Sequence, residues 1–221
     1  MGLRSWPVVG LVLAVVVAAA TITGGLAPAA VADGCPDVEL VFARGTAEPP
    51  GLGRVGDALF AALQPALGSR SLEAYAVNYP ASYNFLTTAD GANDARDHIA
   101  SMADQCLATR IVLGGYSQGA AAVSMLAGVP PVGQRIGNFG SAPPLDPRLA
   151  GKVAAVAVFG NPGERFGTPL SSTGLFAGRA IDQCSSTDPV CTVGARDPSA
   201  HSDYESPPYP GRAARFVAGL V

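Results

Sequence analysis

The amino-acid sequence predicts an α/β protein with a mostly parallel sheet that is covered by helices on both faces. Short apolar runs bounded by glycine or proline recur along the chain, and such runs are typical of buried strands. Stretches of helical pattern separate these runs, and that alternation favours parallel strands joined by helical crossovers. The Pro- and Gly-rich stretches at 128–151 and 160–178 are expected to be loops within one domain.

The expected elements follow the chain in regular order. Five strands are predicted, of which the last is the weakest: Val38–Ala43, Leu72–Val77, Arg110–Gly114, Val153–Phe159 and a run around Ala180 and Ile181. Four helices are predicted between and after them: Val55–Leu67, Gly91–Met102, Ala120–Ala127 and Arg212–Leu220. In an open parallel sheet the binding crevice forms beyond the carboxyl ends of the strands, so the candidate site is expected there.

The amino-terminal segment is expected to be a secretory signal peptide, residues 1–32. It carries Arg4, an apolar run over Val8–Ala20 and an A-x-A cleavage site at Ala30 and Ala32. The run is shorter than the ~20 residues of a spanning helix, so no stable membrane span is expected after cleavage, although a retained anchor is the alternative. The catalytic domain is predicted over 33–221, outside the cell, as a monomer, with retention at the cell wall as an alternative.

Charge and cysteine usage narrow the class of partner. The formal net charge is −3 and there is no basic block, which argues against nucleic acid. The cysteines are even in number and follow a leader, which predicts two disulfides in an oxidising compartment. No C-x-x-C pair is present and the two histidines lie elsewhere, so neither zinc nor another cofactor is expected. The four cysteines are Cys35, Cys106, Cys184 and Cys191.

A nucleophile is predicted at Ser117, within Gly115-Tyr116-Ser117-Gln118-Gly119. The pattern G-x-S-x-G is common, but here it follows a predicted strand and precedes a predicted helix, as in a nucleophile elbow. Glycines on both sides allow the tight turn that projects the serine into the crevice. An ordinary glycine-rich turn is the alternative interpretation.

A serine hydroxyl needs a base, and the chain has two histidines. His201 lies in a predicted loop near the carboxyl terminus, after the serine, where α/β-hydrolases place their histidine. His98 lies in a predicted helix ahead of the serine and is interpreted as a solvated or helix-capping residue.

The acid must then lie between the serine and the histidine in the chain. Asp188 is predicted, because Cys184 and Cys191 bracket it and a disulfide there would hold the carboxylate rigidly against the imidazole. Asp182 and Asp197 are the alternatives. Asp146 and Glu164 also fall in this interval.

Donors to an oxyanion are expected from two loops. The backbone N–H of Gln118 follows the nucleophile, and Thr46 lies in the loop after the first strand, where its hydroxyl could add a hydrogen bond. A simple turn is the alternative for Thr46. The stretch Gly51–Gly56 fits G-x-G-x-x-G, but it does not begin at the strand end, so it is interpreted as a flexible helix entry and not a nucleotide site.

These features together resemble the cutinase family over almost the whole mature chain. The stretch Arg44–Glu48 is similar to the family's oxyanion loop, Gly115–Gly119 to its G-Y-S-Q-G elbow, and the spacing of Asp188 and His201 to its acid and histidine. The resemblance implies a lidless, single-domain α/β-hydrolase that hydrolyses carboxylic esters, with disulfides Cys35–Cys106 and Cys184–Cys191.

The expected function is that of a secreted serine esterase for lipid-type, cutin-type or other short to medium acyl esters. Arg196 and Asp197 stand where cutinases carry an apolar rim, which weakens the expectation for cutin itself. Acetylxylan esterases and phospholipases use the same triad, so the fold leaves the substrate open. The remaining alternatives are a serine peptidase and a non-catalytic surface protein on the same fold.

Overall fold

The computed structural model describes residues 1–3, 34–134 and 139–221. The chain divides into two units, Met1–Ala30 and Val31–Val221. Only three residues of the first unit are described, so most of the predicted leader, and its cleavage site, lie outside the described residues. All the helices and strands that the structure describes belong to the second unit.

The second unit is built on a five-stranded parallel sheet of order β2-β1-β3-β5-β6. The predicted strands are confirmed, with β3 two residues longer than expected because it runs on to the residue before Ser117. Their bounds are β1 Val38–Ala43, β2 Leu72–Ala76, β3 Arg110–Tyr116, β5 Val153–Phe159 and β6 Ala180–Gln183.

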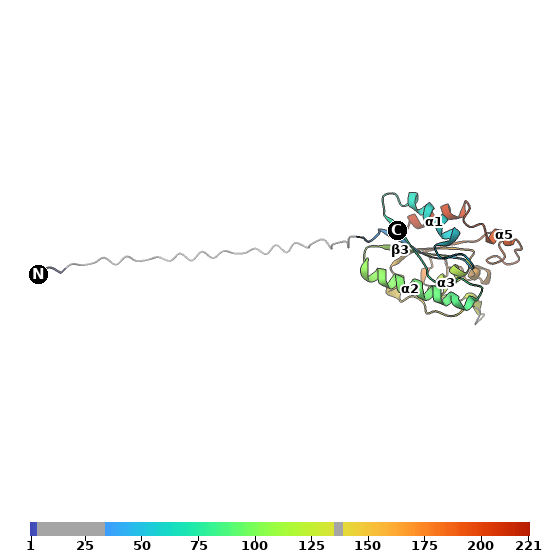
Figure 1. Cartoon of the computed structure of the whole chain (residues 1–221), viewed down its shortest axis with the longest axis horizontal. Helices are drawn as coiled ribbons and strands as arrows, with labels where there is room; N and C mark the ends of the chain where they lie inside the picture. Colours follow the sequence, from blue (N-terminus) through green and yellow to red (C-terminus); the bar gives the residue numbers. More distant parts are fainter. Residues whose placement is uncertain (4–33, 135–138) are drawn as a thin grey trace. The chain divides into compact units, whose positions relative to one another are not determined.

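Helices cover both faces of the sheet, as predicted (Figure 1). Helices α1 (Gly53–Ala66) and α6 (Tyr209–Ala218) pack together on one face, whereas α2 (Thr88–Gln105) and α3 (Gln118–Leu126) pack on the other. Alternation along β1 explains the two cores: Leu40 and Phe42 lie in the cluster under α1 and α6, and Val41 lies in the cluster under α2 and α3.

The two segments expected to be loops contain short elements. Strand β4 (Pro131–Gln134), which is not part of the five-stranded sheet, and helix α4 (Pro147–Ala150) lie in the first, and the 3-10 helices η2 (Pro162–Phe166) and η3 (Gly174–Phe176) lie in the second. Asn161 caps η2 and Asp146 caps α4 by accepting backbone N–H groups. Capped elements of a single turn are too short to show a hydrophobic period, so the sequence does not predict them.

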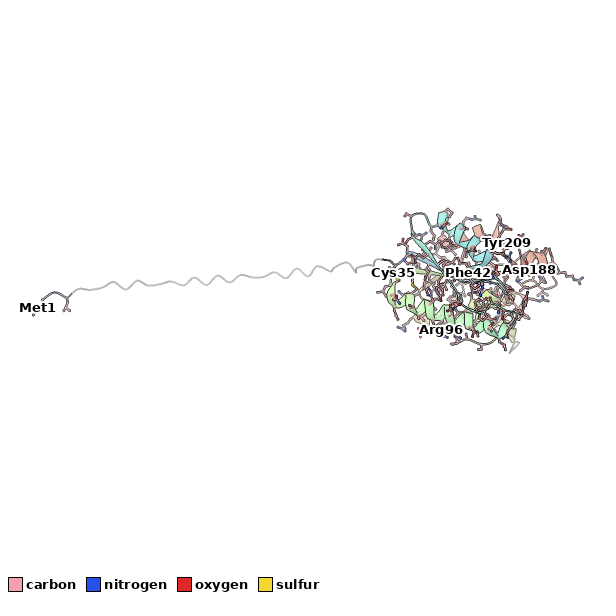
Figure 2. The ribbon with its side chains drawn as sticks, viewed as in Figure 1. Met1, Cys35, Phe42, Arg96, Asp188 and Tyr209 are labelled. Atoms are coloured by element: carbon pink, nitrogen blue, oxygen red, sulfur yellow. A yellow bond between two sulfur atoms is a disulfide. The ribbon has the colours of Figure 1, made fainter. Side chains whose placement is uncertain are left out.

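The parallel register brings the carboxyl ends of four strands to one edge. Ala43 pairs with Gly115, Tyr116 with Phe159, and Phe159 with Gln183. The loops after β1, β3, β5 and β6 therefore meet beyond that edge. Figure 2 shows Cys35 and Asp188 at opposite ends of this unit. Among the described residues, no helix is both long enough and apolar enough to span a membrane.

Candidate active site

Ser117 lies on a sharp turn between β3 and α3. Its backbone has φ 53° and ψ −112°, a conformation that costs energy for any residue with a side chain. A Cβ atom on Gly115 would lie 2.5 Å from the carbonyl of Gly119, and one on Gly119 would lie 1.9 Å from the carbonyl oxygen of Ala43. Both glycines are therefore required, and the turn leaves Ser117 half-buried while Tyr116 and Gln118 are buried.

The structure brings the three predicted catalytic side chains into one hydrogen-bonded chain. His201 Nε2 lies 2.9 Å from Ser117 Oγ, and His201 Nδ1 lies 2.8 Å from Asp188 Oδ2. Since a carboxylate only accepts, Nδ1–H donates to Asp188 and Nε2 is left to accept the serine proton. His201 lies at the end of the short helix α5 (Pro198–His201) and not in a loop as expected.

Asp188 is fully buried inside the turn closed by the Cys184–Cys191 disulfide. Its Oδ1 accepts from the N–H of Val190 at 2.7 Å, and its Oδ2 accepts from the Tyr204 hydroxyl at 2.6 Å. Burial alone would raise the pKa of Asp188, but the hydrogen bonds from His201, Tyr204 and Val190 together lower it below its ordinary value. The carboxylate is thus kept ionised beside the imidazole.

The alternative acids have other partners. Asp182 accepts from the N–H groups of Leu170 and Ser171 at 3.1 and 2.8 Å. Asp197 accepts from Ser199 N and Oγ and caps the helix that carries His201. Neither carboxylate is hydrogen-bonded to the histidine, whereas Asp188 is.

His98 has a different role from the one expected. Its Nε2 lies 3.0 Å from both carboxylate oxygens of Glu39, which is 6% exposed, and its ring stacks on Tyr75 at 3.6 Å between centroids. The interpretation as a solvated or capping histidine was wrong, because the sequence does not reveal that α2 lies across β1. The residue joins the helix to the sheet, away from Ser117.

The loop after β1, predicted to hold the oxyanion, is joined to the elbow through Gln118. Thr46 Oγ1 lies 3.1 Å from Gln118 Oε1, and Gln118 Nε2 lies 3.1 Å from Thr88 Oγ1. The backbone N–H of Gln118 begins α3, where the first turn has no intrahelical acceptors. The guanidinium of Arg44 anchors the other side of the loop by donating to the carbonyls of Glu48, Val77 and Tyr79.

The side-chain carboxylate of Glu48 occupies the glycine-rich entry to α1. Glu48 Oε2 accepts from Gly45 N at 2.6 Å and Glu48 Oε1 accepts from Arg54 N at 3.0 Å. A Cβ atom on Gly53 would lie 2.5 Å from Glu48 Oε2. The glycine at 53 therefore makes room for Glu48. Arg54 in turn donates to Ser202 O and pairs with Glu205, which ties the start of α1 to the segment after His201.

Two tyrosines contact the triad and were not singled out in the sequence. The Tyr116 hydroxyl donates to the carbonyl oxygen of His201 at 2.6 Å, and burial raises the pKa of Tyr116 to about 12. The second is Tyr204, whose hydroxyl donates to Asp188. Tyr116 lies within the elbow pattern, and Tyr204 follows His201 by three residues, but neither spacing signals a hydrogen bond without the fold.

Both disulfides implied by the family resemblance are present, Cys35–Cys106 and Cys184–Cys191. Within the described part of the chain, one group has metal-ligating residue types: Glu164 with Cys184 and Cys191. Because both sulfurs are bonded to each other, they cannot supply thiolate ligands.

Comparison with known proteins decides the family. The family model described as Cutinase matches residues 34–221. The chain belongs to the cutinase family. Membership confirms the predicted α/β-hydrolase fold and the predicted class of enzyme, a serine ester hydrolase. The match begins after the predicted leader and extends to Val221, so every residue of the candidate site falls within the cutinase domain.

The similarity to known proteins covers most of the chain. It is 51% identical to the probable carboxylesterase Culp3 of Mycobacterium tuberculosis, over 86% of this chain and 71% of that protein. It is 49% identical to the phospholipase Culp4 of the same organism, over 92% and 88%. A Trichoderma reesei cutinase in complex with a phosphonate inhibitor superimposes with a TM-score of 0.65 and 33% identity, over 84% and 77%.

Proposed function

We propose that this protein hydrolyses carboxylic esters through an acyl-enzyme formed on Ser117. The observation that carries the proposal is the continuous hydrogen-bonded chain from Ser117 Oγ through His201 to the buried Asp188. A serine hydroxyl within reach of a neutral imidazole, itself oriented by a carboxylate, is the arrangement that makes serine nucleophilic.

The geometry supports a two-step reaction. His201 Nε2 takes the proton of Ser117 as its oxygen attacks the ester carbonyl, and Asp188 stabilises the imidazolium that results. The N–H of Gln118 and the hydroxyl of Thr46 are the donors proposed for the oxyanion. His201 then returns the proton to the leaving alcohol, and the acyl group stays on Ser117. In the second step His201 takes a proton from water, the water oxygen attacks the acyl carbonyl, and the proton passes to Ser117 Oγ as the acid is released.

The proposed substrates carry short to medium acyl chains, including lipid-type esters. Tyr83 and Leu86 are exposed on the segment that follows Ala81, whose carbonyl oxygen accepts from Ala47 N in the oxyanion loop. Val193 is exposed on the loop between Asp188 and His201. These apolar side chains on segments flanking the triad suit an acyl chain or a lipid surface. The carboxylesterase and phospholipase names of the relatives agree with this class.

Two further proposals concern where and how the enzyme acts. The paired cysteines support an oxidising, extracellular location. All three triad residues come from one chain, which supports action as a monomer; a molecular mass measured by light scattering tests this. A mass of two or more chains would contradict it.

A phosphonate serine probe tests the function directly. The purified protein should be labelled at Ser117, the Ser117→Ala variant should not, and turnover of p-nitrophenyl esters should decline as the acyl chain becomes long. A matched amide substrate separates esterase from peptidase. Absence of both labelling and ester turnover would support the non-catalytic alternative and contradict the proposal.

A further inference from the structure

Tyr204 is a completely buried tyrosine whose hydroxyl reaches the triad. The hydroxyl oxygen accepts from Ser185 N at 3.0 Å and lies 2.6 Å from Asp188 Oδ2. A carboxylate cannot donate, so the tyrosine proton points to Asp188. Burial, with Asp188 beside it, raises the pKa of Tyr204 far above its ordinary value, so the proton stays on the tyrosine throughout the range in which an esterase works.

The oxygen that Tyr204 contacts is the one that orients the histidine. Asp188 Oδ2 accepts from both His201 Nδ1, at 2.8 Å, and Tyr204, while Oδ1 accepts from Val190 N. Hydrogen bonds to both carboxylate oxygens fix the plane of the carboxylate. Without the tyrosine hydroxyl, Oδ2 would be held only by the histidine that it is meant to orient.

The ring of Tyr204 is held as firmly as its hydroxyl. It packs against Phe159 at 6.3 Å, Tyr209 at 4.9 Å and His201 at 6.2 Å between ring centroids. A Cβ atom on Gly160 would lie 2.8 Å from His201 Cε1 and 3.0 Å from Tyr204 Cε2. Any side chain at 160 would push on both rings, so this glycine lets the tyrosine and the histidine sit together.

We propose that Tyr204 is a positioning residue that fixes Asp188 Oδ2 against His201 and shares the charge of that carboxylate. The proposal rests on the proposed function for its catalytic consequence. By drawing charge from Oδ2, the hydroxyl weakens the hold of Asp188 on the imidazolium. Once the hydroxyl is removed, the full charge of Asp188 Oδ2 would act on the imidazolium of His201.

Other ionisable groups lie near Asp188 and Tyr204 and influence any measurement of pH dependence. Glu164, from η2, and Tyr116, from β3, interact electrostatically with Asp188, and Tyr209, from α6, interacts with Tyr204. All three remain in place when Tyr204 is replaced by phenylalanine, so a change in pH dependence is attributable to the lost hydroxyl.

The test is Tyr204→Phe, with Tyr209→Phe as the matched control from the same ring cluster. Tyr204→Phe keeps the ring, so it should fold; its kcat should fall by about 10- to 100-fold with KM nearly unchanged. The pH midpoint of kcat/KM should move upward. The control should change neither. In an Asp188→Ala background, adding Tyr204→Phe should cost no further activity, because the tyrosine acts through the carboxylate.

A readout that needs no turnover separates this proposal from the proposed function. The chain has two histidines, so the His201 ring proton can be followed against pH by NMR, with His98→Gln used for assignment. Its titration midpoint should rise in Tyr204→Phe whether or not the protein hydrolyses the esters tried. An unchanged midpoint, or a loss of activity that matches only the unfolded fraction, would overturn the role of Tyr204, while parent turnover and Ser117 labelling test the esterase separately.

Discussion

Thr46 and Gln118, which are 72 positions apart in the chain, are joined by a hydrogen bond of 3.1 Å between Oγ1 and Oε1. Gln118 is 2% exposed and its amide nitrogen donates to Thr88, so the amide is fixed on both sides. The loop after β1 is thereby tied to the residue that follows Ser117, the proposed nucleophile. A hydroxyl held at this place can turn toward a charge that develops on substrate.

Replacing Thr46 with valine should therefore weaken stabilisation of the transition state and leave the binding of substrate unchanged. Valine keeps the branched shape but has no hydroxyl, so kcat should fall by about 10²-fold with KM little changed. Thr46→Ser should retain most activity. Steady-state kinetics on a p-nitrophenyl ester check this, and full activity in Thr46→Val would mean that backbone N–H groups suffice.

The assignment of the acid is tested by three matched substitutions. Asp188→Asn should fold normally and lose activity by on the order of 10⁴-fold, because an amide cannot hold the imidazole in the required tautomer. Asp182→Asn and Asp197→Asn should keep most of the rate, since neither is hydrogen-bonded to His201. Thermal melting alongside kinetics separates misfolding from lost chemistry. High activity in Asp188→Asn with loss in either of the others would refute the assignment.

The two disulfides should have separable effects. Cys35–Cys106 closes a separation of 71 residues at the end opposite Asp188 (Figure 2). The chain-entropy model assigns such a loop roughly 4 kcal/mol, so Cys35→Ala/Cys106→Ala should melt early yet keep its turnover when folded. Cys184–Cys191 closes a short ring around Asp188. Its loss should reduce turnover even at temperatures well below the melting temperature, where the variant is still folded. Activity and melting curves for both pairs check this ranking, and the reverse order would contradict it.

Glu164 predicts a pH dependence of stability. Burial, with Asp182 and Asp188 nearby, raises the pKa of Glu164 from 4.5 to about 8, and its Oε1 is buried without a hydrogen-bond partner among the described residues. The folded state therefore retains a proton that the unfolded state releases. This contribution to stability is fully present below the unfolded pKa and is lost as the pH rises toward about 8.

Glu164→Gln, which stays neutral, should remove that loss. The variant should gain stability relative to the parent as the pH rises, and a gain of 1 kcal/mol corresponds to about 2–4 °C in Tm for a domain of this size. Melting curves at about pH 5 and about pH 8.5 measure the difference. An equal Tm difference at both pH values would show that Glu164 does not titrate in this way.

The predicted leader has an optical test. Trp6 is the only tryptophan in the chain and lies within residues 1–32. Protein recovered outside the cell should therefore show tyrosine emission alone, and its first residue by mass spectrometry should be Asp33. Tryptophan emission from that protein would mean that the leader is retained.

Sequence patterns alone were enough to predict the order of strands and helices, the elbow around Ser117 and the carboxyl-terminal position of His201. These features are local: apolar runs report burial, and the glycines at 115 and 119 report a turn that no side chain permits. The choice of Asp188 also came from local spacing, because two cysteines bracket it. His98, by contrast, was misread, since its partner Glu39 lies 59 positions away on a strand.

The assembled fold was needed to show which groups hold the site in shape. Tyr204 contacts Asp188, Gln118 contacts Thr46, and the carboxylate of Glu48 occupies the glycine-rich entry to α1. No spacing in the sequence predicts the contact of Tyr204 with Asp188 or that of Gln118 with Thr46. Hydrogen bonds of this kind depend on atoms meeting within a few tenths of an ångström after the sheet has assembled. Sequence patterns report which face of an element is buried, and the packed fold decides what each buried polar group meets there.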